Sequence, residues 1–227
     1  MYKKYGMKKT VESLDGVFAF VLVDLNINKT FIARDPIGVR SMYISKSTEG
    51  IGIASELKCL DTFADKNAIE QFSPGKFAEI TSNLSIKIDT YYDYIYDYIG
   101  DTSEDIIMTN IRTKLENAVN KRLLSDRPIG CLLSGGLDSS LITALVAKNF
   151  ERGKLSTFSV GLEGSVDLKY ARQVAEFLGT KHHEVIVTEE QMLEEIENDI
   201  KAIETYDTTT IRASTPMFLL CKYIKEN

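Results

Sequence analysis

The sequence has few residues of the kinds that cross-link a chain or ligate metals. Its 227 residues include no tryptophan, three cysteines, two histidines and four prolines. The cysteines lie far apart, without a Cys-x-x-Cys pair, which predicts reduced thiols in the core of a cytoplasmic protein. These cysteines are Cys59, Cys131 and Cys221. The histidines, His182 and His183, are neighbours; in a strand they would point to opposite faces and could not chelate one metal.

Long apolar runs and an excess of positive charge are also absent. No apolar run approaches the length of a membrane span, and the basic N-terminus lacks the apolar segment of a secretory signal. The net charge is −6 at pH 7, which argues against nucleic-acid binding because that needs a basic face. The sequence therefore predicts a globular cytoplasmic protein with neither a membrane nor a nucleic-acid partner.

Two parts of the chain differ in their hydrophobic pattern. Short β-branched and aromatic runs alternate with turn residues over 14–94, which predicts a β-rich layer. The predicted strands are 17–25, 30–34, 39–45, 51–55 and 76–81. From residue 105 strands alternate with helices, which predicts right-handed βαβ units on a parallel sheet. We therefore expect one domain over 1–94, a linker over 95–104 and an α/β domain over 105–227.

The second part has clear start and stop signals. Strands are predicted over 129–134, 155–161 and 183–187, each followed by a helix. The predicted helix signals are Thr102 with Asp105, Gly179, Thr188 with Gln191, and Thr215 with Pro216. The last helix would carry an apolar face of Met217, Leu220, Cys221 and Ile224. No strand follows to cover that face, so we expect a truncated domain, or one completed by a homodimer or a complementing chain.

The most informative motif is Ser-Gly-Gly-Leu-Asp-Ser-Ser at 134–140, between a predicted strand and its helix. Paired glycines let backbone N–H groups approach a ligand, and a helix start favours an anion. No lysine follows the glycines, as the kinase and GTPase loop requires. Asp138 stands there instead, and a carboxylate beside a polyphosphate implies Mg²⁺. A plain turn with a helix cap would use similar residues, but the complete motif favours nucleotide binding.

Several segments resemble known families. The motif at 134–140 is similar to the pyrophosphate-binding loop of ATP-pyrophosphatase amidotransferases. Segments 14–20, 34–40 and 54–58 look like the later part of a class II glutaminase domain, and 204–216 resembles the asparagine synthetase family. The resemblance implies an α+β and α/β chain. Its glutaminase layer, of the Ntn type, would precede a parallel-sheet PP-loop domain, both of them partial.

The resemblance also implies a reaction and a site. Aspartate would attack Mg-ATP, giving β-aspartyl-AMP and pyrophosphate, and glutamine-derived ammonia would displace AMP to give asparagine. The implied ATP contacts are Leu133, Ser134, Gly135, Gly136, Leu137, Asp138, Ser139, Ser140, Val160 and Gly161, with Asp138 also toward Mg²⁺. Thr209 and Arg212 are implied near the acyl-adenylate. Without the resemblance, a salt bridge at a helix start would be the expected role of Arg212.

Two departures from the family pattern qualify this expectation. Class II glutaminases use an N-terminal cysteine as nucleophile, whereas Tyr2 follows Met1 here. The family's Gly-Glu-Gly-Ser-Asp-Glu motif does not occur in the sequence either. The alternatives are therefore a non-catalytic fragment that acts only with a partner chain, or a carboxylate-adenylating enzyme similar to β-lactam synthetase.

Overall fold

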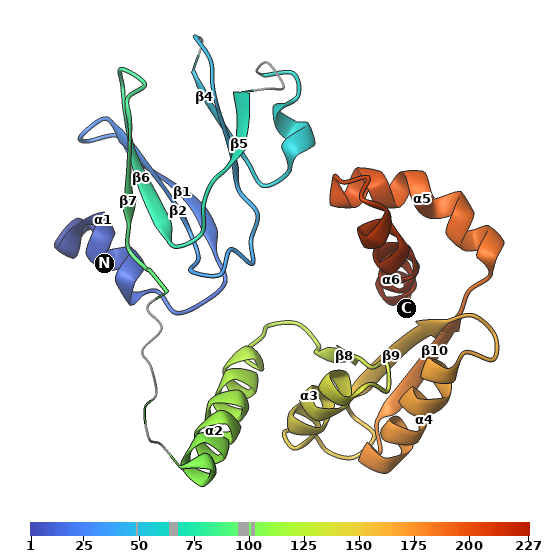
Figure 1. Cartoon of the computed structure of the whole chain (residues 1–227). Coiled ribbons are helices and arrows are strands. Elements are labelled where there is room, and N and C mark those ends of the chain that lie inside the picture. Colours follow the sequence, from blue (N-terminus) through green and yellow to red (C-terminus); the bar gives the residue numbers. More distant parts are fainter. Residues whose placement is uncertain (49, 64–67, 95–99, 101–102) are drawn as a thin grey trace. The chain divides into compact units, whose positions relative to one another are not determined.

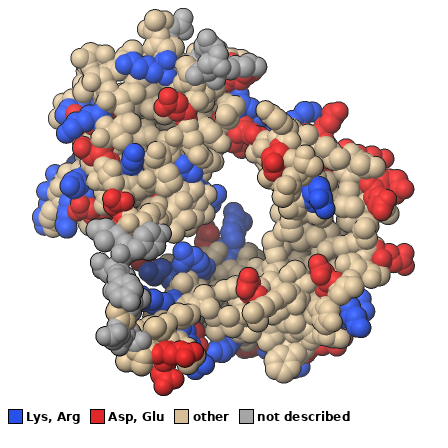
Figure 2. All heavy atoms as spheres, in the orientation of Figure 1, with Lys and Arg blue, Asp and Glu red and all other residues tan. Residues whose placement is uncertain are grey.

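The computed structural model describes residues 1–48, 50–63, 68–94, 100 and 103–227. The chain forms two compact units, Met1–Tyr98 and Ile99–Asn227 (Figure 1). Most of the expected linker, 95–104, lies outside the described residues. On the face drawn in Figure 2, acidic and basic side chains are interspersed on both units. Within the described residues no helix is both long and apolar enough to cross a membrane.

The first unit contains a helix and two antiparallel sheets among its described residues. Helix α1 spans Tyr2–Ser13, which the sequence analysis did not predict, because its two buried residues give little helical periodicity. One sheet has the order β1-β2-β6-β7 and the other the order β4-β3-β5. The strands are β1 (Ala19–Asp24), β2 (Lys29–Arg34), β3 (Tyr43–Lys46), β4 (Ile51–Ala54), β5 (Ile69–Gln71), β6 (Lys76–Thr81) and β7 (Ile86–Thr90). A 3-10 helix, η1 (Leu57–Leu60), follows β4. The predicted β-rich layer is present.

Alternation along β2 buries the larger sheet on both faces. Phe31 and Ala33 pack with Met7 and Val11 of α1. Ile32, between them, points to the opposite face, where it packs with residues of the smaller sheet. This arrangement places the start of the following loop inside the unit.

The side chains of Asp35 and Arg34 hold the loop at residues 35–40 through hydrogen bonds to its backbone. Asp35, which is 1% exposed, accepts hydrogen bonds from the backbone N–H groups of residues 37–40 at 2.7–3.2 Å. Burial raises the pKa of Asp35, but these four N–H groups outweigh it and hold the pKa below its usual value. Arg34 donates to three backbone carbonyls at 2.6–2.8 Å. The predicted turn is thus a rigid, fully paired loop.

The second unit has the predicted alternation of strands and helices. Strands β8, β9 and β10 pair in parallel in the order β10-β9-β8. The elements are α2 (Glu104–Arg122), β8 (Gly130–Leu132), α3 (Leu137–Ala147), β9 (Ser156–Gly161), α4 (Val166–Leu178), β10 (Lys181–Ile186), α5 (Glu189–Ile203) and α6 (Thr208–Glu226). Gly179 ends α4 in the left-handed conformation, and Thr188 with Gln191 forms the predicted capping box. Helix α2 has Ser103 as its N-cap residue, and Thr102 lies outside the described residues.

Central strand β9 presents different side chains to its two faces. Thr157 and Ser159 face α4 and lie within 2.9 and 3.2 Å of the two ring nitrogens of His182. Phe158 faces the other way and stacks on His183, with ring centroids 4.9 Å apart. The two histidines therefore point to opposite faces, as predicted. Burial lowers the pKa of His182, although Glu184 opposes that shift.

Two expectations were wrong. Helix α6 begins at Thr208 with Asp207 as its cap, and not at Thr215, so Pro216 lies inside the helix. The Asp207 side chain accepts a hydrogen bond from the Thr210 N–H at 2.8 Å, which starts the helix two turns earlier than the proline signal indicated. Of the cysteines, only Cys131 is buried, while Cys59 and Cys221 are exposed.

Candidate functional site

The loop that leaves β8 makes its tight turn at one glycine. Gly135 has φ +80°, and a Cβ built on it would lie 2.5 Å from the backbone nitrogen of Ala171 in α4. Gly136 is the N-cap residue of α3 and has φ −71°; a Cβ there would meet only the Ser134 hydroxyl, at 3.4 Å. Only Gly135 is therefore required by backbone geometry, whereas the sequence analysis gave both glycines that role.

Serine hydroxyls occupy the mouth of this loop. The Oγ atoms of Ser134 and Ser139 lie 2.9 Å apart. The backbone N–H of Ser134 donates to the Ser139 hydroxyl, and that of Gly136 to the Ser134 hydroxyl, both at 3.3 Å. The buried Ser140 Oγ has no hydrogen-bond partner among the described residues. The 3.3 Å bonds of the two N–H groups are long, so a ligand with acceptor oxygens could replace the hydroxyls.

A cavity opens between this loop, β9 and α6, and we call it the strand-end cavity. It has a volume of about 260 Å³. Its lining residues are Leu132, Leu133, Ser134, Ser139, Phe158, Ser159, Val160, Asp167, Met217 and Leu220. Sites that enclose a whole drug-sized ligand usually exceed 300 Å³. The strand-end cavity therefore suits one portion of a nucleotide, with the remainder on the exposed loop.

Only some of the residues predicted to contact ATP line the strand-end cavity. Leu133, Ser134, Ser139 and Val160 share the strand-end cavity. Gly161 does not line this cavity; it packs closely against the start of α4, where a Cβ would lie 3.1 Å from side chains. Leu137 is 83% exposed at the first position of α3.

Asp138 lies apart from the strand-end cavity. It is exposed in the first turn of α3, where the helix dipole favours a negative charge. Together with Ser139 it lines a second cavity, of about 590 Å³, between α2, β8 and α3. No group of three His, Cys, Asp or Glu side chains in the described parts of the chain is arranged to hold a metal. A cation beside Asp138 would thus need oxygen ligands from a bound phosphate, and the exposed position leaves room for one.

Helix α6 runs antiparallel to the strands, on the face that carries Phe158. Its C-terminal Ile224 lines a cavity with Gly130 and Ser156, the first residues of β8 and β9. About one to two turns earlier, Leu220 and Met217 line the strand-end cavity at the other end of those strands. Figure 1 shows α6 on one side of this sheet and α3 and α4 on the other. The N-terminal part of α6 therefore continues past the carboxyl ends of the strands.

This direction brings the predicted acyl-adenylate contacts toward the loop. At about 1.5 Å per residue, Arg212 lies roughly 8 Å and Thr209 roughly 12 Å along the helix beyond Met217. Both side chains are exposed. Arg212 makes no ion pair with any residue that the structure describes. The guanidinium is therefore available to a ligand, and the expected helix-start salt bridge is not formed there.

Asp167 also lines the strand-end cavity and was not predicted from the sequence. Its place in the first turn of α4, shortly after the end of β9, was the available signal. Met217 and Leu220 were recognised only as an apolar helix face. That face covers the cavity from α6.

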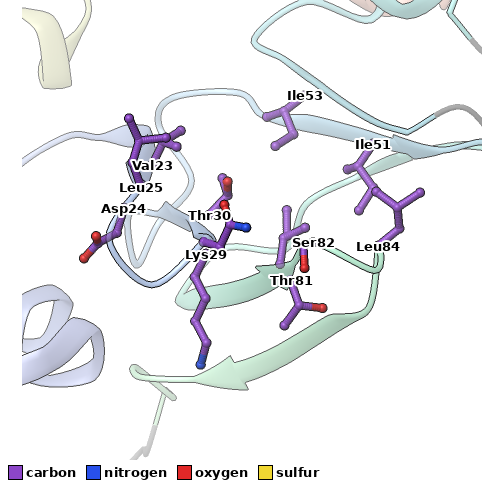
Figure 3. A pocket seen from close by; sticks show the side chains of 12 residues that line it. Val23, Asp24, Leu25, Lys29, Thr30, Ile51, Ile53, Thr81, Ser82 and Leu84 are labelled. Atoms are coloured by element: carbon purple, nitrogen blue, oxygen red, sulfur yellow. The ribbon is translucent and has the colours of Figure 1, made fainter.

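A cavity of about 280 Å³ in the first unit is a weaker candidate (Figure 3). Its wall is largely aliphatic, from Ile51, Ile53, Ile80 and their neighbours. Its two charged residues are engaged elsewhere: Asp24 accepts a hydrogen bond from Tyr2 at 2.9 Å, and Lys29 pairs with Glu79 at 2.5 Å. Figure 3 shows the Lys29 side chain pointing away from Ile53. This cavity offers no convergent reactive groups.

Both units of the chain match known protein families. The family described as Asparagine synthase matches residues 110–227, more than half of the chain. The chain belongs to the asparagine synthase family. The family described as Glutamine amidotransferase domain matches residues 1–62. The Ser134–Ser140 loop and α6 both lie within the residues that match the asparagine synthase family.

Relatives within the family match the whole chain. "Asparagine synthetase [glutamine-hydrolyzing]" of Mus musculus is 36% identical over 252 residues, covering 100% of this chain and 45% of the relative. "Asparagine synthetase [glutamine-hydrolyzing] 1" of Arabidopsis thaliana is 44% identical over 234 residues, covering 99% and 39%. The chain thus spans less than half the length of these relatives. A glutamine phosphoribosylpyrophosphate amidotransferase structure from B. subtilis has a TM-score of 0.35 at 16% identity over 80% of this chain and 50% of its own, too weak a likeness to carry an argument.

Proposed function

We propose that the chain binds Mg-ATP at the Ser134–Ser140 loop and forms part of an enzyme that makes asparagine from aspartate. One observation carries this proposal. A loop with weakly engaged N–H and hydroxyl groups opens at the carboxyl end of a parallel sheet, where such sheets bind ligands. The family membership and the names of the relatives support asparagine as the product.

In this proposal the loop holds the phosphates and the strand-end cavity takes the nucleoside. The N–H groups of Ser134 and Gly136 would exchange their 3.3 Å hydroxyl bonds for phosphate oxygens. Fixed donors of this kind stabilise the charge that develops on phosphate oxygens during transfer. A bound Mg²⁺ would neutralise charge between the phosphates and the Asp138 carboxylate. Leu133 and Val160 would contact the nucleoside.

Arg212 and Thr209 would act on the other reactant. A guanidinium binds a carboxylate or a phosphate through two parallel hydrogen bonds. Arg212, near the N-terminal end of α6, would hold the aspartate carboxylate near the α-phosphorus, and Thr209 would contact the acyl-adenylate. Ammonia, from glutamine or free in solution, would then displace AMP. The free thiols of all three cysteines support a reducing, cytoplasmic setting.

Titration calorimetry with Mg-ATP tests the proposal. Asp138→Ala should weaken Mg-ATP binding about tenfold, because it removes one oxygen ligand of the cation, and should not weaken metal-free ATP binding, where the carboxylate only repels the phosphates. The matched control is Asp126→Ala, which removes an exposed carboxylate of the same unit outside the loop. No heat at millimolar Mg-ATP, or an equal loss with and without Mg²⁺, would contradict the proposal.

A further inference from the structure

We infer that Asp199 of α5 is a positioning residue that fixes the direction of the first two turns of α6, and with them Thr209 and Arg212. What those two side chains do rests on the proposed function. Their placement rests on contacts in the structure alone. The two claims can therefore be tested separately.

Asp199 joins α5 to α6 from a buried position. The residue is 1% exposed, and its Oδ2 accepts hydrogen bonds from the hydroxyls of Ser214 at 2.5 Å and Thr215 at 3.0 Å. Thr215 is itself 4% exposed. One carboxylate oxygen thus holds two consecutive residues of α6 in a dry contact, where hydrogen bonds to a charged group are strong.

This contact is made where α6 is weakest. Pro216 has no N–H to donate to the Arg212 carbonyl, and its ring crowds that carbonyl. The Thr215 hydroxyl also lies 2.8 Å from the preceding carbonyl, of Ile211, so its one proton is shared between that carbonyl and Asp199 Oδ2. The backbone ladder is therefore interrupted just after Arg212. The contacts of Asp199 with Ser214 and Thr215 therefore join α6 to α5 next to this interruption.

The segment before the interruption has little other support. Residues 208–210, 212 and 213 are exposed, and Ile211 is half-buried. The Asp207 cap bonds to Thr210, which is within the same segment, so it shapes the first turn without fixing that turn to the rest of the unit. The attachment of this segment to α5 through residues 214 and 215 therefore determines where it points.

The chemistry of the contact also favours a directional role over simple stabilisation. The other oxygen of Asp199, Oδ1, is buried and accepts no hydrogen bond from the described residues. Burying a charged group with an unpaired oxygen costs free energy that an apolar pair would not. The same two helices are also joined by Glu195 and Lys222 at 2.9 Å, in a more exposed pair toward the far end of α6. Holding two specific hydroxyls gives geometric definition that apolar contact lacks.

Amide hydrogen exchange of the ligand-free chain tests the placement. Asp199→Ala should speed exchange of residues 208–213 roughly tenfold or more, because the segment loses its attachment and opens more often. Asp199→Asn keeps an acceptor oxygen and should restore most of the protection. Glu195→Gln, the matched control, weakens the other link between the same helices and should leave residues 208–213 unchanged.

Three outcomes would overturn the inference. One is unchanged exchange at 208–213 in Asp199→Ala, and another is an equal increase in Glu195→Gln. If Asp199→Ala does not fold, Thr215→Val removes one bonded hydroxyl at constant shape, and unchanged exchange in that variant would also overturn it. Each result is read without nucleotide and so does not depend on the proposed function.

A second measurement connects placement to chemistry. Asp199→Ala should bind Mg-ATP with an affinity within about threefold of the unaltered chain, because the Ser134–Ser140 loop is untouched. Its aspartate-dependent release of pyrophosphate should fall roughly tenfold or more, with recovery in Asp199→Asn. If the unaltered chain neither binds Mg-ATP nor releases pyrophosphate, the proposed function fails while the exchange result still decides the placement. Parallel losses of binding and release would contradict a role confined to α6.

Discussion

Each unit has a loop that follows a strand and in which backbone N–H groups cluster, residues 35–40 in the first unit and 134–140 in the second. The hydrogen-bond partners of these N–H groups differ between the two loops. In the first unit, four N–H groups of residues 37–40 are taken by the buried carboxylate of Asp35. In the second unit, the N–H groups of Ser134 and Gly136 meet only serine hydroxyls, at 3.3 Å. The first loop pairs its N–H groups with its own carboxylate, whereas the N–H groups of Ser134 and Gly136 bond to serine hydroxyls and not to the exposed Asp138 carboxylate.

The difference separates a structural loop from a binding loop. Clustered N–H donors attract an anion in either case. Where the chain supplies the anion from a buried position, the loop is rigid and closed to a ligand. Where only neutral hydroxyls lie near the donors, a phosphate can replace them at small cost. The hydrogen-bond partner of the backbone N–H groups, more than the number of these groups, therefore decides which loop can bind a ligand.

The largest expected effect follows from altering the tight turn of the open loop. Gly135→Ala should destabilise the second unit by roughly 3 kcal/mol, because the new Cβ meets the α4 backbone and alanine disfavours the positive φ. Urea unfolding of the two variants would measure this. Gly136→Ala is the matched control and should cost less than about 1 kcal/mol, since its φ is negative and only a serine hydroxyl is near. Equal losses in both variants would show that our assignment of the turn is wrong.

The closed loop should respond to loss of its charge. Asp35→Asn leaves one oxygen acceptor and places an NH₂ group against the backbone N–H of Arg40, so we expect about 1–3 kcal/mol of destabilisation. Calorimetric unfolding would measure it. Asp93→Asn removes an exposed carboxylate of the same unit and should change little. If both variants behave alike, the buried carboxylate does not organise the loop.

The two units should also differ in their sensitivity to acid. Burial lowers the pKa of His182 in the folded protein, so the unfolded chain binds the proton more readily. Stability of the second unit is thus complete above about pH 6.5 and decreases as pH falls from there toward the folded pKa. The pKa of Asp35 is lowered overall, so its contribution is lost only as pH falls below about 4.

Amide exchange in β9 and β2, followed between pH 7 and pH 5, would report the units separately. Protection should decrease in β9 and persist in β2. His182→Gln should remove much of the change in β9. A variant that retains the full pH response would assign it to other groups, such as the Arg172–Glu184 pair beside His182.

Local signals predicted the second unit well. The strand, loop and helix around residues 134–140 were predicted because an apolar run, glycines and a helical period agree there. Thr188 and Gln191 formed their capping box because both partners lie within one turn. Leu133, Ser134, Ser139 and Val160 meet in one cavity because the carboxyl ends of parallel strands lie at the same edge.

The failures have different causes: two concern local helix geometry and one a tertiary contact. Pro216 indicated a helix start, yet Asp207 caps α6 earlier and the helix continues through the proline. Cys221 follows the buried Leu220, but one residue is about 100° of helix rotation, which turns its side chain outward. Asp199 gave no signal either, since its partners are 15 and 16 residues away on another helix.

The alternation along β9 has a consequence for how the sheet assembles. A shift of one position against β10 would carry Phe158 toward α4, where Ala171 and Ala175 are fully packed, and would move two hydroxyls against the His183 ring. The shifted register would therefore be destabilised by poor packing on both faces of the sheet. The side-chain pattern of β9 therefore favours a single register with β10. That register fixes the position of Val160 beside the Ser134–Ser140 loop.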